Sequence, residues 1–256
     1  MFLGTVNILG LFLATNIAQA ADFSFEELQK IAPTMMPLLD VIAEGEGEYY
    51  SINRGRAGDS PGDWPKEHLG KSITQMTLLE LRGHQGGKNE DCWLNGKRGK
   101  AGLYAVGRYQ LIPCTFQWAL SRIEGIDMQL LYNEQNQDAL ATYLVLVKRP
   151  VLGAYLLGWS RSFKEAGQEL AKEFASVPIQ YRNKRCKRGQ SYYCNDSAGN
   201  AAQISLNKIK HVLPKTRRAL MQNKEIQKLI AQKEDWRLRC RRILRRFLQR
   251  FRVIKQ

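Results

Sequence analysis

The sequence predicts an α+β fold that is mostly helical and carries one small β-hairpin. Several apolar-periodic segments begin with Ser or Thr followed three residues later by Glu, a pattern typical of helix starts. One segment, LYAVGRYQLI over residues 103–112, alternates weakly and turns at Gly107, which indicates a short hairpin or strand. The 44% apolar and 25% charged residues are ordinary for a globular protein and exclude a wholly disordered or collagen-like chain.

The first twenty residues, MFLGTVNILGLFLATNIAQA, contain no charged side chain and end in a small-x-small sequence, Ala18-Gln19-Ala20. This pattern predicts a cleaved signal peptide and therefore an exported protein, periplasmic or secreted. Because no Lys or Arg precedes the apolar part, an uncleaved membrane anchor and a buried N-terminal helix are the alternatives. Beyond residue 20 no apolar run reaches the roughly 18 residues that a further membrane span requires.

The domain after the signal is expected to begin with a helix at the capping box Ser24-x-x-Glu27. Pro33 and Pro37 are expected to interrupt this helix, because proline lacks the N–H that the helix interior uses. A second helix is predicted to start at Pro37 and to end in the glycines and tyrosines of residues 45–50.

The rest of the domain is predicted as short helices separated by loops rich in Gly, Pro, Ser and Asp. The loops are expected over residues 51–71, 86–102 and 181–200. The helices are expected over 77–84, after Pro113, and over 134–147, 162–176 and 201–212. These elements together predict one domain over residues 21–213.

Positive charge is concentrated after that domain. Residues 1–213 hold 24 basic and 21 acidic side chains, whereas residues 214–256 hold 15 and 3. In the tail, apolar side chains recur at spacings of three and four: Trp236, Cys240, Ile243, Leu244, Phe247, Leu248 and Phe251. This pattern predicts a basic amphipathic helix over part of residues 214–256 that lies on an anionic membrane or wall surface. Docking of the stripe on the domain or on a second copy is the alternative, and export disfavours nucleic acid as a partner.

Export would place the five cysteines in an oxidising compartment. Cys186 and Cys194 flank a short loop and are predicted to form a disulfide, and Cys92 with Cys114 is a second, weaker pairing. Cys240 would then be left over. Because no cysteine pair has zinc-ligand spacing and the three histidines are isolated, the sequence predicts neither a metal site nor a cofactor.

One glutamate interrupts an apolar helix face. Leu39, Ile42 and Glu46 lie at positions i, i+3 and i+7, so Glu46 shares the buried stripe, whereas Asp40, Glu44 and Glu48 form a separate polar stripe. Apolar surroundings favour the protonated carboxyl group and raise its pKa. A general acid for glycoside cleavage needs such a group, so Glu46 is the candidate catalytic residue. The alternative is a solvent-facing glutamate at a frayed helix end.

Four segments resemble the family of lytic transglycosylases that includes the lysozyme of phage lambda. In LLDVIAEGEGEY (38–49) the shared positions are Leu39, Asp40, Ala43, Glu46 and Gly47, and AVGRYQLI (105–112) matches a second family segment. Residues 137–139 and 175–178 match in order, so the resemblance covers about residues 38–212. Residues 50–59, 189–193 and 199–200 are also similar to phage-type muramidases.

The resemblance implies a lysozyme-like domain that cleaves the glycan strands of peptidoglycan. It implies that Glu46 carries out both proton transfers of a reaction that yields 1,6-anhydro ends. The expected saccharide-binding residues are Arg108, Tyr109, Gln110, Tyr192 and Tyr193. A scaffold salt bridge is the equal alternative for Arg108, and the sequence does not select between the adjacent tyrosines, because neighbours on an extended stretch point opposite ways.

Two other functions are compatible with the sequence. A hydrolytic muramidase, or lysozyme, needs a second carboxylate, for which Asp59 and Asp63 are the candidates. The loop 53–59 would then line the cleft, or form a plain exposed turn. Alternatively, a membrane-active or wall-binding protein could use the lysozyme-like domain only as a scaffold. The sequence predicts no particular oligomeric state.

Overall fold

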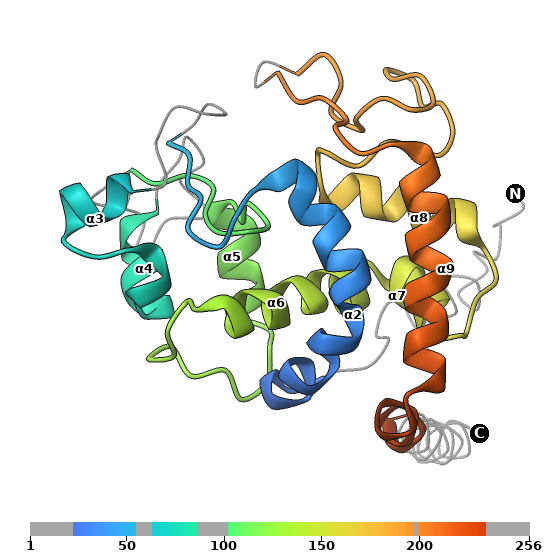
Figure 1. The fold of residues 1–256 in the computed structure, drawn as a ribbon, viewed down its shortest axis with the longest axis horizontal. Helices are drawn as coiled ribbons and strands as arrows, with labels where there is room; N and C mark the ends of the chain where they lie inside the picture. Colours follow the sequence, from blue (N-terminus) through green and yellow to red (C-terminus); the bar gives the residue numbers. More distant parts are fainter. Residues whose placement is uncertain (1–22, 55–62, 86–101, 197–198, 234–256) are drawn as a thin grey trace, which may run out of the picture.

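A computed structural model describes residues 23–54, 63–85, 102–196 and 199–233 of the chain. As the sequence predicts, this part of the protein is mostly helical (Figure 1). The helices are α2 (Phe25–Glu46), α3 (Trp64–Leu69), α4 (Leu78–His84), α5 (Pro113–Leu120), α6 (Glu134–Tyr143), α7 (Pro150–Leu156), α8 (Phe163–Glu173) and α9 (Leu206–Gln222). A 3-10 turn (Ile73–Gln75) precedes α4, a π-helical turn (Leu144–Lys148) extends α6, and residues 224–233 are also helical.

The described residues contain isolated β-bridges but no β-strand, so the expected hairpin is replaced by a tight turn. Val106 and Leu111 exchange two backbone hydrogen bonds of 3.3 and 2.9 Å, and the chain reverses between them at Gly107, whose φ is 74°. A Cβ atom at Gly107 would lie 2.3 Å from Gln137 Oε1. Glycine is therefore required here both for the backbone conformation and for the close packing.

Helix α2 runs continuously through Pro33 and Pro37, so the expected interruption is wrong. Its N-terminus has the predicted capping box between Ser24 and Glu27, with hydrogen bonds of 2.7 and 3.3 Å. Each proline costs about 3 kcal/mol in a helix interior. The helix buries seven large apolar side chains, each stabilising by about 1.5–3 kcal/mol, and this burial outweighs the two lost hydrogen bonds. These side chains are Phe25, Leu28, Ile31, Met35, Leu38, Leu39 and Ile42.

Helix α9 packs antiparallel against α2 (Figure 1). An ion pair joins Lys208 to Glu44 near the end of α2, and Asn223 donates a 3.1 Å bond to Thr34 near its middle. Farther along the chain, Lys233 pairs with the capping-box Glu27 at 2.8 Å. The chain therefore runs back along α2, away from the end that carries Glu46.

The expected domain boundary between residues 213 and 214 falls inside α9. Beyond it, Thr216, Leu220, Ile226 and Ile230 are all buried, so residues 214–233 belong to the packed body. The boundary was placed where basic residues become concentrated, but the helical spacing of buried apolar side chains continues past it. The stripe that begins at Trp236 and the expected signal peptide lie outside the described residues.

The other expected helices differ mainly in their ends. Helix α4 begins at the predicted capping box of Thr77 and Glu80, whereas Ser162 bonds the side chain of Glu165 and makes no backbone cap. Helix α3 lies within the stretch 51–71 expected to be a loop. Proline in its first turn and Gly70 after its last residue, at φ 79°, are signals that could have predicted it.

The predicted disulfide between Cys186 and Cys194 is confirmed, with Cα atoms 5.8 Å apart. Cys114 is also disulfide-bonded, and its expected partner Cys92 lies outside the described residues. Within those residues no single helix is long and apolar enough to cross a membrane. Only the helical stretch 134–148 taken together with α7 reaches that length, and the two are bent by 101°.

Candidate active site

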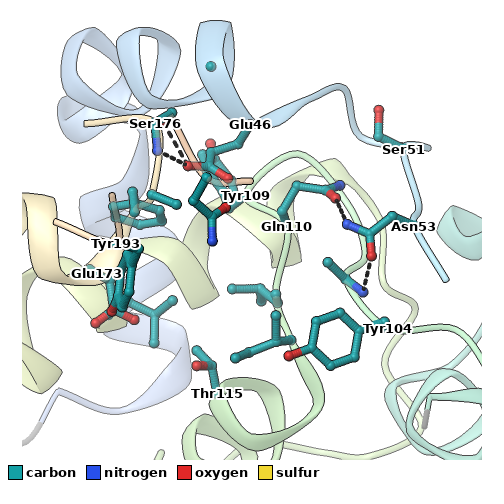
Figure 2. A pocket seen from close by; sticks show the side chains of 18 of the residues that line it. Glu46, Ser51, Asn53, Tyr104, Tyr109, Gln110, Thr115, Glu173, Ser176 and Tyr193 are labelled. Atoms are coloured by element: carbon teal, nitrogen blue, oxygen red, sulfur yellow. Dashed lines mark hydrogen bonds between the residues drawn. The ribbon is translucent and has the colours of Figure 1, made fainter. Parts of the chain in front are cut away.

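A cavity of about 710 Å³ lies where the end of α2 meets three other segments. The first carries residues 50–53 and the second carries residues 104–112. The third is formed by residues 172–176 together with residues from 193–196 and 199–203. Its volume is within the range of small-molecule pockets. Figure 2 shows Glu46 and Ser176 together on one side, with Gln110 and Asn53 on another.

Glu46 is the last residue of α2 and lines this cavity. Its Oε1 atom accepts a 3.1 Å bond from the backbone N–H of Ser176 and a 2.6 Å bond from the Ser176 hydroxyl. Burial raises the pKa of Glu46, and the two bonds from Ser176 offset only part of that effect. The side chain therefore holds its proton to a higher pH than an exposed glutamate does, and can donate it inside the cavity.

The glycines on either side of Glu46 allow other segments to approach it. A Cβ atom at Gly45 would lie 2.4 Å from the Cβ of Ser176, and one at Gly47 would lie 2.9 Å from Ser51. Larger residues at these positions would push away the serine that bonds the carboxylate and the serine that lines the cavity. Ser176 lies in one of the segments that resemble the family, but its contact with Glu46 was not predicted from the sequence.

A neutral polar wall faces the cavity next to Glu46. Gln110, expected to bind saccharide, lines it, accepting a 3.0 Å bond from Asn53 Nδ2 and donating a 2.9 Å bond to the carbonyl of Gly107. Asn53 is fixed in turn by backbone bonds of 2.8 Å to Ala105 and Tyr104. These amides are held in place and can bond uncharged hydroxyl and acetamido groups.

The two residues before Gln110 have different positions. Arg108 does not line the cavity; it pairs with Asp40 at 2.8 Å and stacks on Tyr49, so the scaffold alternative applies to it. Tyr109 borders the cavity but is only 2% exposed, and its hydroxyl donates a 2.5 Å bond to Asp138. Burial raises the pKa of both Tyr109 and Asp138. Tyr109 therefore supports the cavity floor, and its hydroxyl is engaged away from a ligand.

The two adjacent tyrosines, Tyr192 and Tyr193, have different environments in the structure. Tyr193 lines the cavity, and its hydroxyl donates a 2.6 Å bond to the carbonyl of Lys172. Tyr192 packs against the hydrophobic core. Of the two, Tyr193 is the one placed to meet a ligand.

Of the two candidate second carboxylates, the structure describes only Asp63, and it does not bring this residue to the site. Asp63 precedes α3, is exposed and does not line the cavity, and Asp59 lies outside the described residues. Two other acids, Glu173 and Asp196, line the cavity instead. Sequence reasoning missed both, although Glu173 lies only three residues before the Ser176 that bonds Glu46.

Glu173 ends α8 with a side chain that is 2% exposed. Its Oε1 atom pairs with Lys148 at 2.6 Å, and its Oε2 atom pairs with Arg149 Nε at 2.6 Å. Both carboxylate oxygens are thus held by cations. Asp196 is exposed and accepts a 2.6 Å bond from Asn200.

Within the described part of the chain no group of acidic, histidine or cysteine side chains could hold a metal ion. No protein-family model, no curated protein and no solved structure matches the chain. The function therefore has to be inferred from the geometry of the site together with the motifs of the sequence.

Proposed function

We propose that this protein is a lytic transglycosylase with a lysozyme-like helical domain. It cleaves the β-1,4 bond between N-acetylmuramic acid and N-acetylglucosamine in peptidoglycan. The observation that carries the proposal is Glu46, a glutamate with a raised pKa at the wall of a cavity of about 710 Å³. None of the ion pairs among the described residues involves it.

In the first step Glu46 donates its proton to the glycosidic oxygen, so that the bond to the muramic acid breaks and the N-acetylglucosamine leaves with a new hydroxyl group. The acetamido group of the muramic acid stabilises the cationic carbon. Ser176 supports this step, because its N–H and hydroxyl both donate to the carboxylate that remains.

In the second step the Glu46 carboxylate removes the proton of the 6-hydroxyl of the same muramic acid. The hydroxyl oxygen closes on the cationic carbon and forms the 1,6-anhydro ring. The proton returns to Glu46, no water is consumed, and no second carboxylate is needed. The fixed amides of Gln110 and Asn53 are placed to hold the sugar during both steps.

Hydrolysis by a muramidase is the second candidate, and one observation favours it. Asp196 lines the cavity and is exposed, so it could orient a water molecule. Glu173 is less suited to this role, because Lys148 and Arg149 hold both of its oxygens.

Digestion of purified peptidoglycan with the full chain, followed by mass spectrometry of the released muropeptides, tests the proposal. We expect 1,6-anhydro ends, and we expect Asp196→Asn to release the same products. Reducing ends that disappear in Asp196→Asn would instead establish hydrolysis. Intact peptidoglycan after digestion would favour the scaffold alternative.

A further inference from the structure

The loop between α8 and α9 contains a dense group of positive charges. Residues 181–195 hold five basic side chains and no acidic one: Arg182, Lys184, Arg185, Lys187 and Arg188. All five are exposed. We call residues 181–190 the basic loop. Among the described residues, no carboxylate forms an ion pair with any of its cations.

The backbone of the basic loop is held in place. Cys186 is joined by a disulfide to Cys194, and Ile179 and Gln190 share a 2.8 Å backbone bond at the base of the loop. Within the loop, the side-chain oxygen of Asn183 accepts hydrogen bonds from the backbone N–H groups of Arg185 and Cys186, the second at 2.7 Å. Because the loop is tied at several points, its cations are presented from a fixed surface.

This loop continues directly into one wall of the cavity. Tyr193 lies inside the segment closed by the disulfide and lines the cavity, where it bonds the backbone of Lys172. Lys148, Arg149 and Lys172 line the cavity on this same side. In Figure 1 the loops between α8 and α9 lie above α8 and α9, at the same end of the molecule as the last turn of α2.

The cavity and the basic loop therefore differ in charge. The wall with Ser51, Asn53 and Gln110 is neutral and suits uncharged sugar groups. The wall with Lys148, Arg149 and Lys172 is largely compensated, because Glu173 and Glu169 pair with these cations and Asp196 also lines the cavity. The basic loop, in contrast, has no acidic residue within residues 181–195. Charge that is not compensated within the protein attracts an anionic partner.

We propose that the basic loop binds the free carboxylates of the stem peptides on the glycan strand that occupies the cavity. The inference rests on the proposed function, because a peptidoglycan strand carries such peptides on its muramic acids. Uncharged sugars would then lie along the neutral wall, and the acidic peptides would extend over the basic loop. Arg182 and Arg185 can bind a carboxylate with two parallel hydrogen bonds.

The test measures binding without turnover, using the full chain with Glu46→Gln. The probes are peptidoglycan stripped of phosphate polymers and the same glycan after an amidase has removed its stem peptides. The loop variant replaces Arg182, Lys184, Arg185 and Lys187 by Gln and keeps Arg188, which donates a hydrogen bond to the carbonyl of Gln180 just before the loop. A matched control removes four exposed charges elsewhere by the changes Lys210→Gln, Lys215→Gln, Arg218→Gln and Lys224→Gln.

We expect the loop variant to bind stem-bearing peptidoglycan about tenfold more weakly than the parent, since four exposed ion pairs each contribute little. Binding to the stem-free glycan should not change, and the control should bind like the parent. The difference should vanish at about 1 M salt, where charges are screened within about 3 Å.

Equal losses on both glycans, or an equal loss in the control, would overturn the inference and indicate non-specific attraction. Unchanged binding of the loop variant, or a loss seen only when phosphate polymers are left on the wall, would also overturn it. Turnover is scored separately with Glu46 intact. A chain that binds stem peptides through the loop but releases no muropeptides would overturn the proposed function alone.

Discussion

Glu46 and Glu173 line the same cavity in opposite electrostatic surroundings. Glu46 ends α2, receives two bonds from the uncharged Ser176, and has a raised pKa because it is buried. Glu173 ends α8 and lies between Lys148 and Arg149, with both oxygens paired at 2.6 Å. Two glutamates at the ends of two helices are thus suited to different tasks.

The difference shows that the partner of a carboxyl group determines whether the group can transfer a proton or stabilises the fold. A carboxyl group without a cation can gain and lose a proton, because no opposite charge holds it in the ionised form. A carboxylate held by two cations has both oxygens engaged, and removing it would leave buried positive charge. We therefore expect changes at Glu46 to affect turnover and changes at Glu173 to affect folding.

The largest effect is expected from Glu46→Gln. Because general acid catalysis contributes about 10²–10⁴-fold, and one residue here carries both proton transfers, we expect turnover of peptidoglycan to fall at least about 10³-fold. The measurement is muropeptide release, with thermal unfolding to establish that the variant is folded. Glu48→Gln, an exposed change two residues away, is the matched control and should retain turnover. Residual activity near that of the control would remove Glu46 from the mechanism.

The next effect is expected from Glu173→Gln. The change leaves Lys148 and Arg149 without their shared carboxylate, so we expect the free energy of unfolding to fall by about 2–4 kcal/mol. Urea denaturation measures this loss. Glu169→Gln breaks the more exposed pairs with Arg149 and Lys172 and should cost less. Equal losses in the two variants would contradict the distinction between the two glutamates.

A smaller effect concerns the pH dependence of stability. Burial raises the native pKa of Glu46 above its value in the unfolded chain, so the native state binds the proton more tightly. The contribution of Glu46 to stability is therefore full below the unfolded pKa and is lost as pH rises through the native pKa. Glu46→Gln removes this titration, and its free energy of unfolding relative to the wild type should be higher at pH 7 than at about pH 4. Urea denaturation at both pH values is the check, and a relative stability that falls with pH would contradict the raised pKa.

The smallest effect is expected from Ser176→Ala. The hydroxyl of Ser176 lowers the pKa of Glu46, so its loss should raise that pKa further and move the alkaline limb of the pH–activity profile to higher pH. Ser51→Ala removes a hydroxyl from the same cavity without a bond to Glu46 and is the control. A profile that stays in place, or that moves in both variants, would contradict the assigned role of Ser176.

Local signals in the sequence predicted most of the helical fold. Capping boxes located the starts of α2 and α4, and the apolar spacing before Glu46 put this glutamate on the buried side of α2. Pro33 and Pro37 were misleading, because local propensity does not count the apolar surface that a central helix buries. The charge boundary at residue 213 misled for the same reason, since α9 continues to pack beyond it.

The sequence by itself determined that the chain is mostly helical, that Cys186 bonds Cys194, and that Glu46 shares an apolar stripe. These features depend on residues that are close along the chain. Only the tertiary structure decided which partner each carboxylate receives, because Ser176 reaches Glu46 across 130 residues and Arg149 reaches Glu173 across 24. Burial and charge at the cavity follow from those long-range contacts, which no local spacing encodes.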